Sequence, residues 1–140
     1  MYVGVLGSDR LRVLPIWELE FGELARGTHP IATERVKHDT DYQERRNILQ
    51  GPAENLSPEI EARIQRLAKR ICRTLDLDGY ARIDFRLTSD GVPYFLEANP
   101  NPEIASGEEF AQAALYGGLS YPELIDRIVA MAIRRARVRG

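Results

Sequence analysis

The sequence has few of the residues that several common kinds of protein require. Its single cysteine, Cys72, excludes an internal disulfide and a multi-cysteine zinc site. Because 19 Lys and Arg stand against 21 Asp and Glu, it lacks the basic excess of a general nucleic-acid-binding protein. No apolar run approaches the roughly 20 residues needed to span a bilayer, and no signal peptide is expected. These absences predict a cytoplasmic protein with no nucleic-acid partner and no membrane partner.

The remaining composition suits one folded domain. A chain of 140 residues is long enough for one core and too short for two ordinary ones, so we expect a single domain over residues 1–140. The 44% hydrophobic residues supply that core. Lysine is rare, since only Lys37 and Lys69 occur among the 19 basic residues.

Residue patterns predict an α+β fold, with a mostly antiparallel sheet and about three helices on one side of it. Helices are predicted to begin at Ser57, Ser106 and Ser120, because each of these residues opens a capping signature. Apolar alternation predicts strands over residues 2–6, 12–21, 31–37, 80–89 and 92–98.

The most informative segment is the hairpin predicted around Asp90-Gly91. A two-residue Asp-Gly loop is typical of a tight hairpin turn, and it fixes which residues of the two strands face each other. On one face it pairs Leu87 with Tyr94, Phe85 with Leu96, and Ile83 with Ala98. That face is apolar, and we expect it to pack inward.

The opposite face of the hairpin is polar. Here Asp84 is predicted to face Glu97, and Arg82 to face Asn99, with paired Cβ atoms about 4.5–5.5 Å apart. Two carboxylates at that spacing repel each other. A shared proton, ion pairs with Arg82 and Arg86 on a solvated face, or a cation between the carboxylates would each relieve the repulsion. Asn99 adds a third oxygen donor, which favours a hard cation such as Mg²⁺, and Arg82 suits a phosphate or an oxyanion.

Several segments resemble the ATP-grasp D-alanine–D-alanine ligase family. The likeness is carried mainly by residues 81–86, 90–91 and 94–102, which resemble its metal-binding segment. Residues 2–7, followed by Leu14-Pro15 and Glu18, are similar to the family strand pair. Residues 34–37, followed by residues 51–53, are similar to its mobile loop region. The resemblance implies the C-terminal portion of an ATP-grasp domain that lacks the adenine hinge and the glycine-rich loop. No GxGxxG or Walker-type loop is present in the sequence to replace them.

The resemblance also implies roles for five residues. Asp84 would bind one Mg²⁺, Glu97 would bridge two, and Asn99 would hold the second, with Mn²⁺ as a possible substitute. Arg82 would contact the transferred phosphate and a later tetrahedral oxyanion. Lys37 would contact the phosphates of ATP.

The activity implied by the resemblance is ATP-dependent ligation of a carboxylate to an amine through an acyl phosphate, with small amino-acid-like substrates. The family has a Thr-x-Pro-Gly-Met-Thr-like run after its last metal ligand, whereas residues 103–107 here depart from it, so D-alanine itself is not implied. One alternative is a non-catalytic module or fragment that binds ATP and metal, with a separate N-terminal ATP-grasp part as its partner. A structural domain with a solvated charged face is the other.

Overall fold

The computed structural model describes residues 1–20 and 49–139. Residues 1–17 and 52–140 form one compact unit, and residues 18–51 form a second. The first unit holds Arg82, Asp84, Glu97 and Asn99. Lys37 and the strand predicted over residues 31–37 lie outside the described residues.

An antiparallel sheet forms the centre of the first unit. β1 pairs with β5, and β5 pairs with β6. β1 also pairs with β2 and with the first residue of β3, and β3 in turn neighbours β4. The strands are β1 (Tyr2–Gly7), β2 (Arg12–Val13), β3 (Trp17–Glu20), β4 (Leu49–Pro52), β5 (Gly79–Leu87) and β6 (Pro93–Asn99).

One face of this sheet packs against α3 (Pro58–Thr74). The helix begins as predicted, because Ser57 accepts a hydrogen bond from the Ile60 amide and Pro58 occupies the first turn. Because successive side chains of a strand point to opposite faces, one set of apolar side chains points toward α3. The buried cluster consists of Val3, Val5, Ile16, Ile64, Ala68, Cys72, Ala81, Ile83 and Phe85.

The other face of the sheet is covered by α4 (Glu109–Tyr116). The close approach occurs at Gly4 of β1, where a Cβ atom would lie 2.7 Å from Leu14 Cδ1 and 3.0 Å from Phe110 Cε2. Glycine at this position therefore leaves room for the Leu14 and Phe110 side chains to pack against β1. The Phe110 ring also makes an edge-on contact with Tyr80, at a centroid separation of 6.0 Å.

The last helix, α5 (Tyr121–Arg139), packs on α4 and on β5. Its start at Ser120 is confirmed as a capping box, because a Glu123 carboxylate oxygen accepts hydrogen bonds from the Ser120 amide at 2.9 Å and hydroxyl at 2.6 Å. The predicted start at Ser106 is wrong, since α4 begins at Glu109 and the Ser106 carbonyl accepts instead from the Gln112 amide side chain. No helix in residues 1–20 and 49–139 is long and apolar enough to cross a bilayer.

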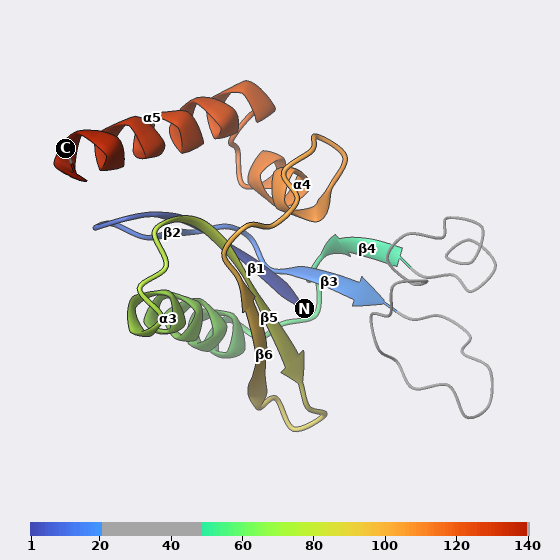
Figure 1. The fold of residues 1–140 in the computed structure, drawn as a ribbon. Coiled ribbons are helices and arrows are strands. Elements are labelled where there is room, and N and C mark those ends of the chain that lie inside the picture. Colours follow the sequence, from blue (N-terminus) through green and yellow to red (C-terminus); the bar gives the residue numbers. More distant parts are fainter. Residues whose placement is uncertain (21–48, 140) are drawn as a thin grey trace. The chain divides into compact units, whose positions relative to one another are not determined.

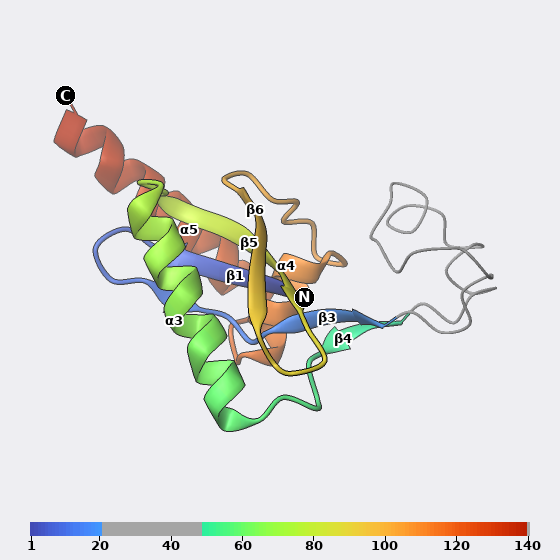
Figure 2. The same cartoon turned by 90° about the horizontal axis from the view of Figure 1, so that it is seen from below.

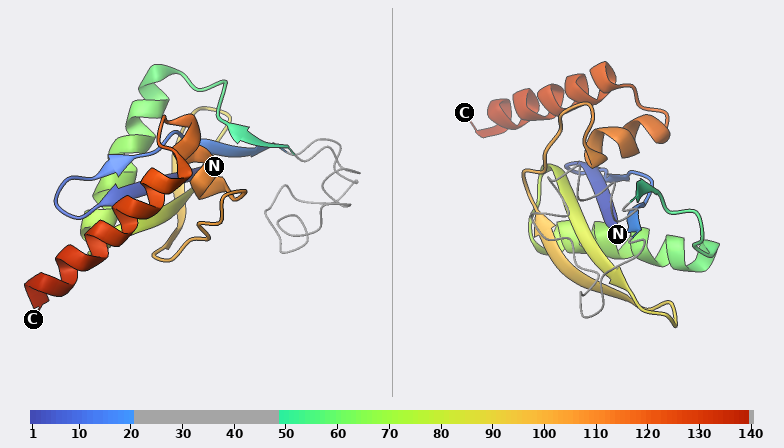
Figure 3. Two further views of the ribbon diagram at one scale, coloured as in Figure 1. Left: turned by 90° about the horizontal axis from the view of Figure 1, so that it is seen from above. Right: turned by 90° about the vertical axis from the view of Figure 1, so that its right-hand side faces the viewer.

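The predicted α+β fold, with three helices on an antiparallel sheet, is confirmed, but the helices do not share one side. α3 lies on one face of β1 and β5, whereas α4 and α5 lie on the other (Figure 1; Figure 3, right). Seen from below, α3 is on the near side of these strands (Figure 2). The reason is that β1 is buried on both faces, by Val3 and Val5 on one and by Tyr2 and Leu6 on the other. Each face therefore needs a covering layer.

Cys72 provides a test of the core beneath α3. Its side chain is 2% exposed, and burial raises the pKa of the thiol from its usual 9.0 to about 11. The folded-state pKa is above the unfolded one, so the stability gained by keeping the thiol protonated is complete below pH 9 and is lost as the pH rises through 11.

We therefore expect the free energy of unfolding to fall between pH 9 and 11, as measured by urea denaturation. The free energy of unfolding of Cys72→Ala is expected to fall less over the same pH range. In a thiol-reagent assay at pH 8, Cys72 should react slowly in the folded protein and completely in urea. Fast reaction of the folded protein would contradict the assignment of Cys72 to the core.

Candidate metal- and phosphate-binding site

The turn of the β5–β6 hairpin differs from the predicted two-residue loop. The Gly91 amide donates to the Thr88 carbonyl at 3.0 Å, and the Thr88 amide donates to the Val92 carbonyl at 3.1 Å. Gly91 has φ of +79°, whereas Asp90 does not adopt a positive φ. A tight two-residue turn of the predicted kind needs positive φ at both central residues, so the chain forms a three-residue loop over Ser89, Asp90 and Gly91 instead.

A bulge in the ladder then restores the predicted pairing at the site. Near the turn, Phe85 faces Phe95 rather than Leu96, but Asp84 faces Glu97, with the shift falling between Asp84 and Phe85. Leu96 is the extra residue on β6. The prediction that this part of β6 packs inward is wrong, because Tyr94, Phe95 and Leu96 are exposed.

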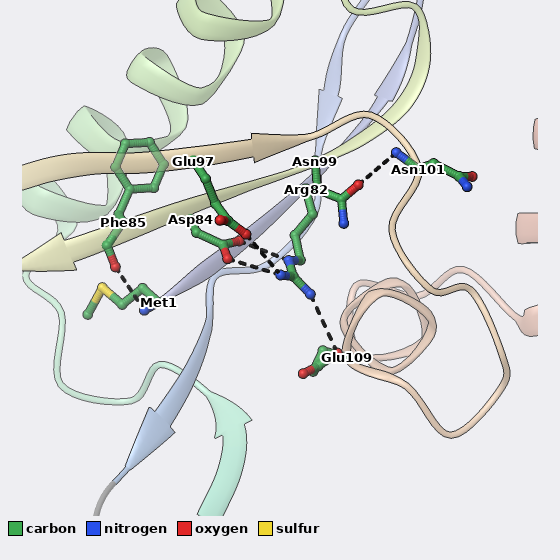
Figure 4. A network of polar contacts seen from close by, with 8 residues as sticks. All are labelled: Met1, Arg82, Asp84, Phe85, Glu97, Asn99, Asn101 and Glu109. Carbon is green, nitrogen blue, oxygen red and sulfur yellow. Dashed lines mark hydrogen bonds and ion pairs between the residues drawn. The ribbon is translucent and has the colours of Figure 1, made fainter. Parts of the chain in front are cut away.

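The four polar residues predicted to share a face do so (Figure 4). Asp84 faces Glu97 and Arg82 faces Asn99 in the β5–β6 ladder. The guanidinium of Arg82 donates from Nε to Asp84 Oδ1 at 2.8 Å and from Nη2 to Asp84 Oδ2 at 3.0 Å. Arg82 and Asp84 are 9% and 7% exposed, so this is a buried bidentate ion pair.

Two further carboxylates surround the same guanidinium. Glu97 Oε1 lies 3.8 Å from Arg82 Nη2, and Glu109 Oε2 lies 4.0 Å from Arg82 Nη1 (Figure 4). Both separations exceed hydrogen-bonding distance, so these contacts act through charge. Burial lowers the pKa of Arg82, but its hydrogen bonds with Asp84 and the charges of Asp84 and Glu109 outweigh burial, so the pKa is raised. Arg82 therefore remains charged.

A hydrogen-bonded chain holds Asn99 at the end of β6. The Asn101 amide donates to Asn99 Oδ1 at 2.9 Å. The Tyr80 hydroxyl in turn donates to Asn101 Oδ1 at 2.7 Å. The bend after β6 is thereby tied to β5, and the Asn99 oxygen is held on the site face.

The donor set fits a hard divalent cation. Asp84, Glu97 and Asn99 offer oxygen only, which suits Mg²⁺ or Mn²⁺. A carboxylate has about four lone-pair sites, so the two hydrogen bonds from Arg82 do not by themselves fill Asp84. The Glu97 side chain is 60% exposed and therefore accessible to an incoming ion. In the part of the chain described, no three His, Cys, Asp or Glu side chains group as metal ligands.

Comparison with known proteins identifies the family. The family model described as the D-Ala–D-Ala ligase C-terminus matches residues 1–130. This chain belongs to that family. Among its relatives, the D-alanine–D-alanine ligases of Geobacillus kaustophilus and Bacillus cytotoxicus are 32% and 35% identical to it over 133 residues each. Those matches cover 95% of this chain but only 33% and 34% of the relatives, so the chain spans about a third of their length.

Solved structures agree on the fold. The D-alanine–D-alanine ligase of Bacillus anthracis, complexed with ATP, superimposes with a TM-score of 0.72 at 20% identity. The superposition covers 99% of this chain and 39% of the ligase. The α+β architecture described for residues 1–20 and 49–139 is therefore shared with the solved ligase.

Two residues at the ligase-like site were not singled out by the sequence. Tyr2 lies under the Arg82 guanidinium, with Arg82 Cζ 4.7 Å from the ring centroid. The sequence signal for Tyr2 was the alternation of β1, which places Tyr2 on the other face of the strand from Val3 and Val5. From the sequence, Glu109 was predicted only to be part of a helix cap. No local sequence pattern predicts that the start of α4 lies beside β5.

The buried Arg82–Asp84 ion pair is expected to be required for the stability of the fold. Arg82→Met leaves Asp84 buried without its guanidinium, and we expect the free energy of unfolding to drop by about 3–5 kcal/mol. The double variant Arg82→Met/Asp84→Leu removes both charges and should recover most of that loss. Urea denaturation of the wild type and the three variants, including Asp84→Leu alone, measures the coupling. A cost below about 1 kcal/mol for Arg82→Met would contradict a buried, structurally required pair.

Proposed function

We propose that this chain supplies the metal- and phosphate-binding hairpin of an ATP-dependent carboxylate–amine ligase. The observation that carries the proposal is the convergence of Arg82, Asp84, Glu97 and Asn99 on one face of the hairpin. Membership of the D-Ala–D-Ala ligase C-terminal family supports it. The ATP bound to the Bacillus anthracis ligase supports ATP as the nucleotide.

Three residues would hold the metal. Asp84 would bind one Mg²⁺, Asn99 would bind a second, and Glu97 would contribute to both. When bound there, the ions neutralise negative charge on the β- and γ-phosphates of ATP. Asn99 enters this role already oriented by Asn101, so little side-chain freedom remains to be lost on binding.

The proposed reaction has two steps. A substrate carboxylate oxygen attacks the γ-phosphorus of ATP, the bond from that phosphorus to the β,γ-bridging oxygen breaks, and ADP leaves. A substrate amine then attacks the carbonyl carbon of the acyl phosphate. The tetrahedral intermediate expels phosphate and the nitrogen loses a proton, so the products are an amide, ADP, phosphate and one proton.

We propose that Arg82 stabilises the negative charge that develops in both steps. Its permanent charge suits the phosphoryl oxygens in the first step and the oxyanion in the second. The bidentate pair with Asp84 leaves Nη1 on the side of α4, where Glu109 meets it only at 4.0 Å. Lys37, which lies outside the described residues, is proposed to contact the ATP phosphates.

We further propose that residues 1–140 are a single domain, the C-terminal portion of an ATP-grasp domain. An N-terminal ATP-grasp part, on the same polypeptide or as a separate partner, would then supply the adenine hinge and the glycine-rich loop. The substrates are small and amino-acid-like, and residues 103–107 differ enough from the family run that we do not assign D-alanine. We propose that the reaction takes place in the cytoplasm, where ATP is available.

The metal site is tested by ligand-dependent stability. Mg²⁺ with ATP at ten times the dissociation constant should raise the Tm of the wild type by about 4 °C. Asp84→Asn and Glu97→Gln remove a carboxylate ligand and should lose most of that rise. Differential scanning fluorimetry measures the shifts, and electron paramagnetic resonance of Mn²⁺ reports metal binding directly.

Glu103→Gln is the matched control, since it removes an exposed carboxylate that lies beyond the proposed ligand set. It should retain the full shift. If Glu97→Gln and Glu103→Gln respond alike, the assignment of Glu97 as a ligand fails. A wild type without any shift at millimolar Mg²⁺ and ATP would favour the structural reading of the charged face.

A non-catalytic module that binds ATP and metal is the second candidate. It is favoured by residues 103–107, which depart from the family run that follows the last metal ligand. The two candidates differ in turnover. A ligase forms ADP at a rate that rises when a carboxylate and an amine substrate are both added, whereas a binding module shows the thermal shift without ADP. A coupled assay for ADP, run on the wild type and on Arg82→Lys, separates them.

A further inference from the structure

Tyr2 makes a contact that the proposed chemistry does not yet use. The Arg82 guanidinium carbon lies 4.7 Å from the centroid of the Tyr2 ring. Tyr2 is 6% exposed, so the contact is removed from water. A guanidinium over an aromatic face is attracted by the ring quadrupole, and the attraction is strongest where water is excluded.

The register of the sheet explains how this contact arises. In the β1–β5 ladder Tyr2 faces Asp84, and Gly4 faces Arg82. Because the Arg82 side chain reaches along its strand to Asp84, its guanidinium passes over the residue opposite Asp84, which is Tyr2. Gly4 has no side chain to obstruct this path.

The contacts of Arg82 come from three directions. The Tyr2 ring covers one flat face of the guanidinium. Asp84 takes the edge formed by Nε and Nη2, and Glu109 lies on the side of Nη1. The bidentate pair with Asp84 holds one edge of the guanidinium. A ring packed against the guanidinium carbon adds a second restraint on its plane, and with it on the direction of the remaining N–H groups.

We propose that Tyr2 is a positioning residue of the site, whose ring holds the Arg82 guanidinium in the plane needed to meet a transferred phosphoryl group. The role in phosphoryl transfer rests on the proposed function, whereas the orientation of Arg82 is independent of it. The ring, and not the hydroxyl, is the active part. Burial, reinforced by the Glu109 carboxylate, raises the pKa of Tyr2 to about 12, so the phenol is neutral at working pH.

Two substitutions separate the ring from the bulk of the side chain. Tyr2→Phe keeps the ring and removes the hydroxyl, whereas Tyr2→Leu keeps apolar bulk and removes the ring. Tyr116→Leu is the matched control, because it removes an exposed aromatic ring that contacts Trp17 and not Arg82. If Tyr2→Leu does not fold, Tyr2→Met replaces it as the longer ring-free side chain.

The first measurement reports, without any ligand, the contact of the Tyr2 ring with Arg82 on which the proposed orientation depends. In nuclear magnetic resonance spectra, the Arg82 side-chain signals, assigned by their loss in Arg82→Lys, should show an upfield ring-current shift. The shift should persist in Tyr2→Phe and Tyr116→Leu and disappear in Tyr2→Leu. Unchanged Arg82 signals in folded Tyr2→Leu would overturn the proposal.

The second measurement reports the consequence for phosphate binding. Tyr2→Leu should weaken ATP binding in the presence of Mg²⁺ about tenfold, with Tyr2→Phe within about twofold of the wild type. Mn²⁺ binding without nucleotide should be unchanged, because its ligands are on β5 and β6. Equal weakening of Mn²⁺ and ATP binding would indicate a merely structural role and overturn the positioning claim.

The two measurements also separate this inference from the proposed function. If the wild type binds no ATP with Mg²⁺, the proposed function fails, while the ring-current shift still decides whether Tyr2 orients Arg82. If ATP binds and the shift is absent in the wild type, the proposed function stands and the role of Tyr2 fails.

Discussion

The bidentate pair between Arg82 and Asp84 is the interaction on which the rest of the site depends. It places a positive charge between carboxylates that the hairpin brings face to face, so the sheet can bury this surface beneath α4. Removing water from an ion pair costs several kcal/mol per ion, and two hydrogen bonds with good geometry offset that cost. Arg82 therefore stabilises the folded site through Asp84, which is also one of the proposed metal ligands.

The β-bulge is the constraint that aligns the site, and it shows what local patterns can and cannot establish. The Asp90-Gly91 signal correctly indicated a hairpin, and the pairing of Asp84 with Glu97 was predicted. The structure reaches that pairing by a different route from the predicted one. A three-residue loop shifts the register by one residue, and the extra residue Leu96 in β6 shifts it back. Had the chain formed the loop without the bulge, Asp84 would face Leu96. Loop and bulge geometry depend on backbone dihedrals that residue alternation does not encode.

Predictions from alternation and capping succeeded where the signal is local and failed where it depends on distant segments. The start of α3 at Ser57 and that of α5 at Ser120 follow from contacts within a few residues. The division of the helices between two faces depends instead on how Gly4 admits α4, and this packing joins segments about a hundred residues apart. The same distance explains why Glu109 could not be recognised as a neighbour of Arg82 from the sequence.

The charge balance of the site ties metal binding to nucleotide binding. Around the guanidinium of Arg82 the described residues place three carboxylates, those of Asp84, Glu97 and Glu109. Such a surface attracts cations, and by itself it repels the phosphates of ATP. Divalent ions reverse that balance, because each adds two positive charges beside the accessible Glu97. We therefore expect ATP to bind only together with a divalent ion. Arg82 would then orient the phosphate, while the ion would supply the net positive charge that attracts it.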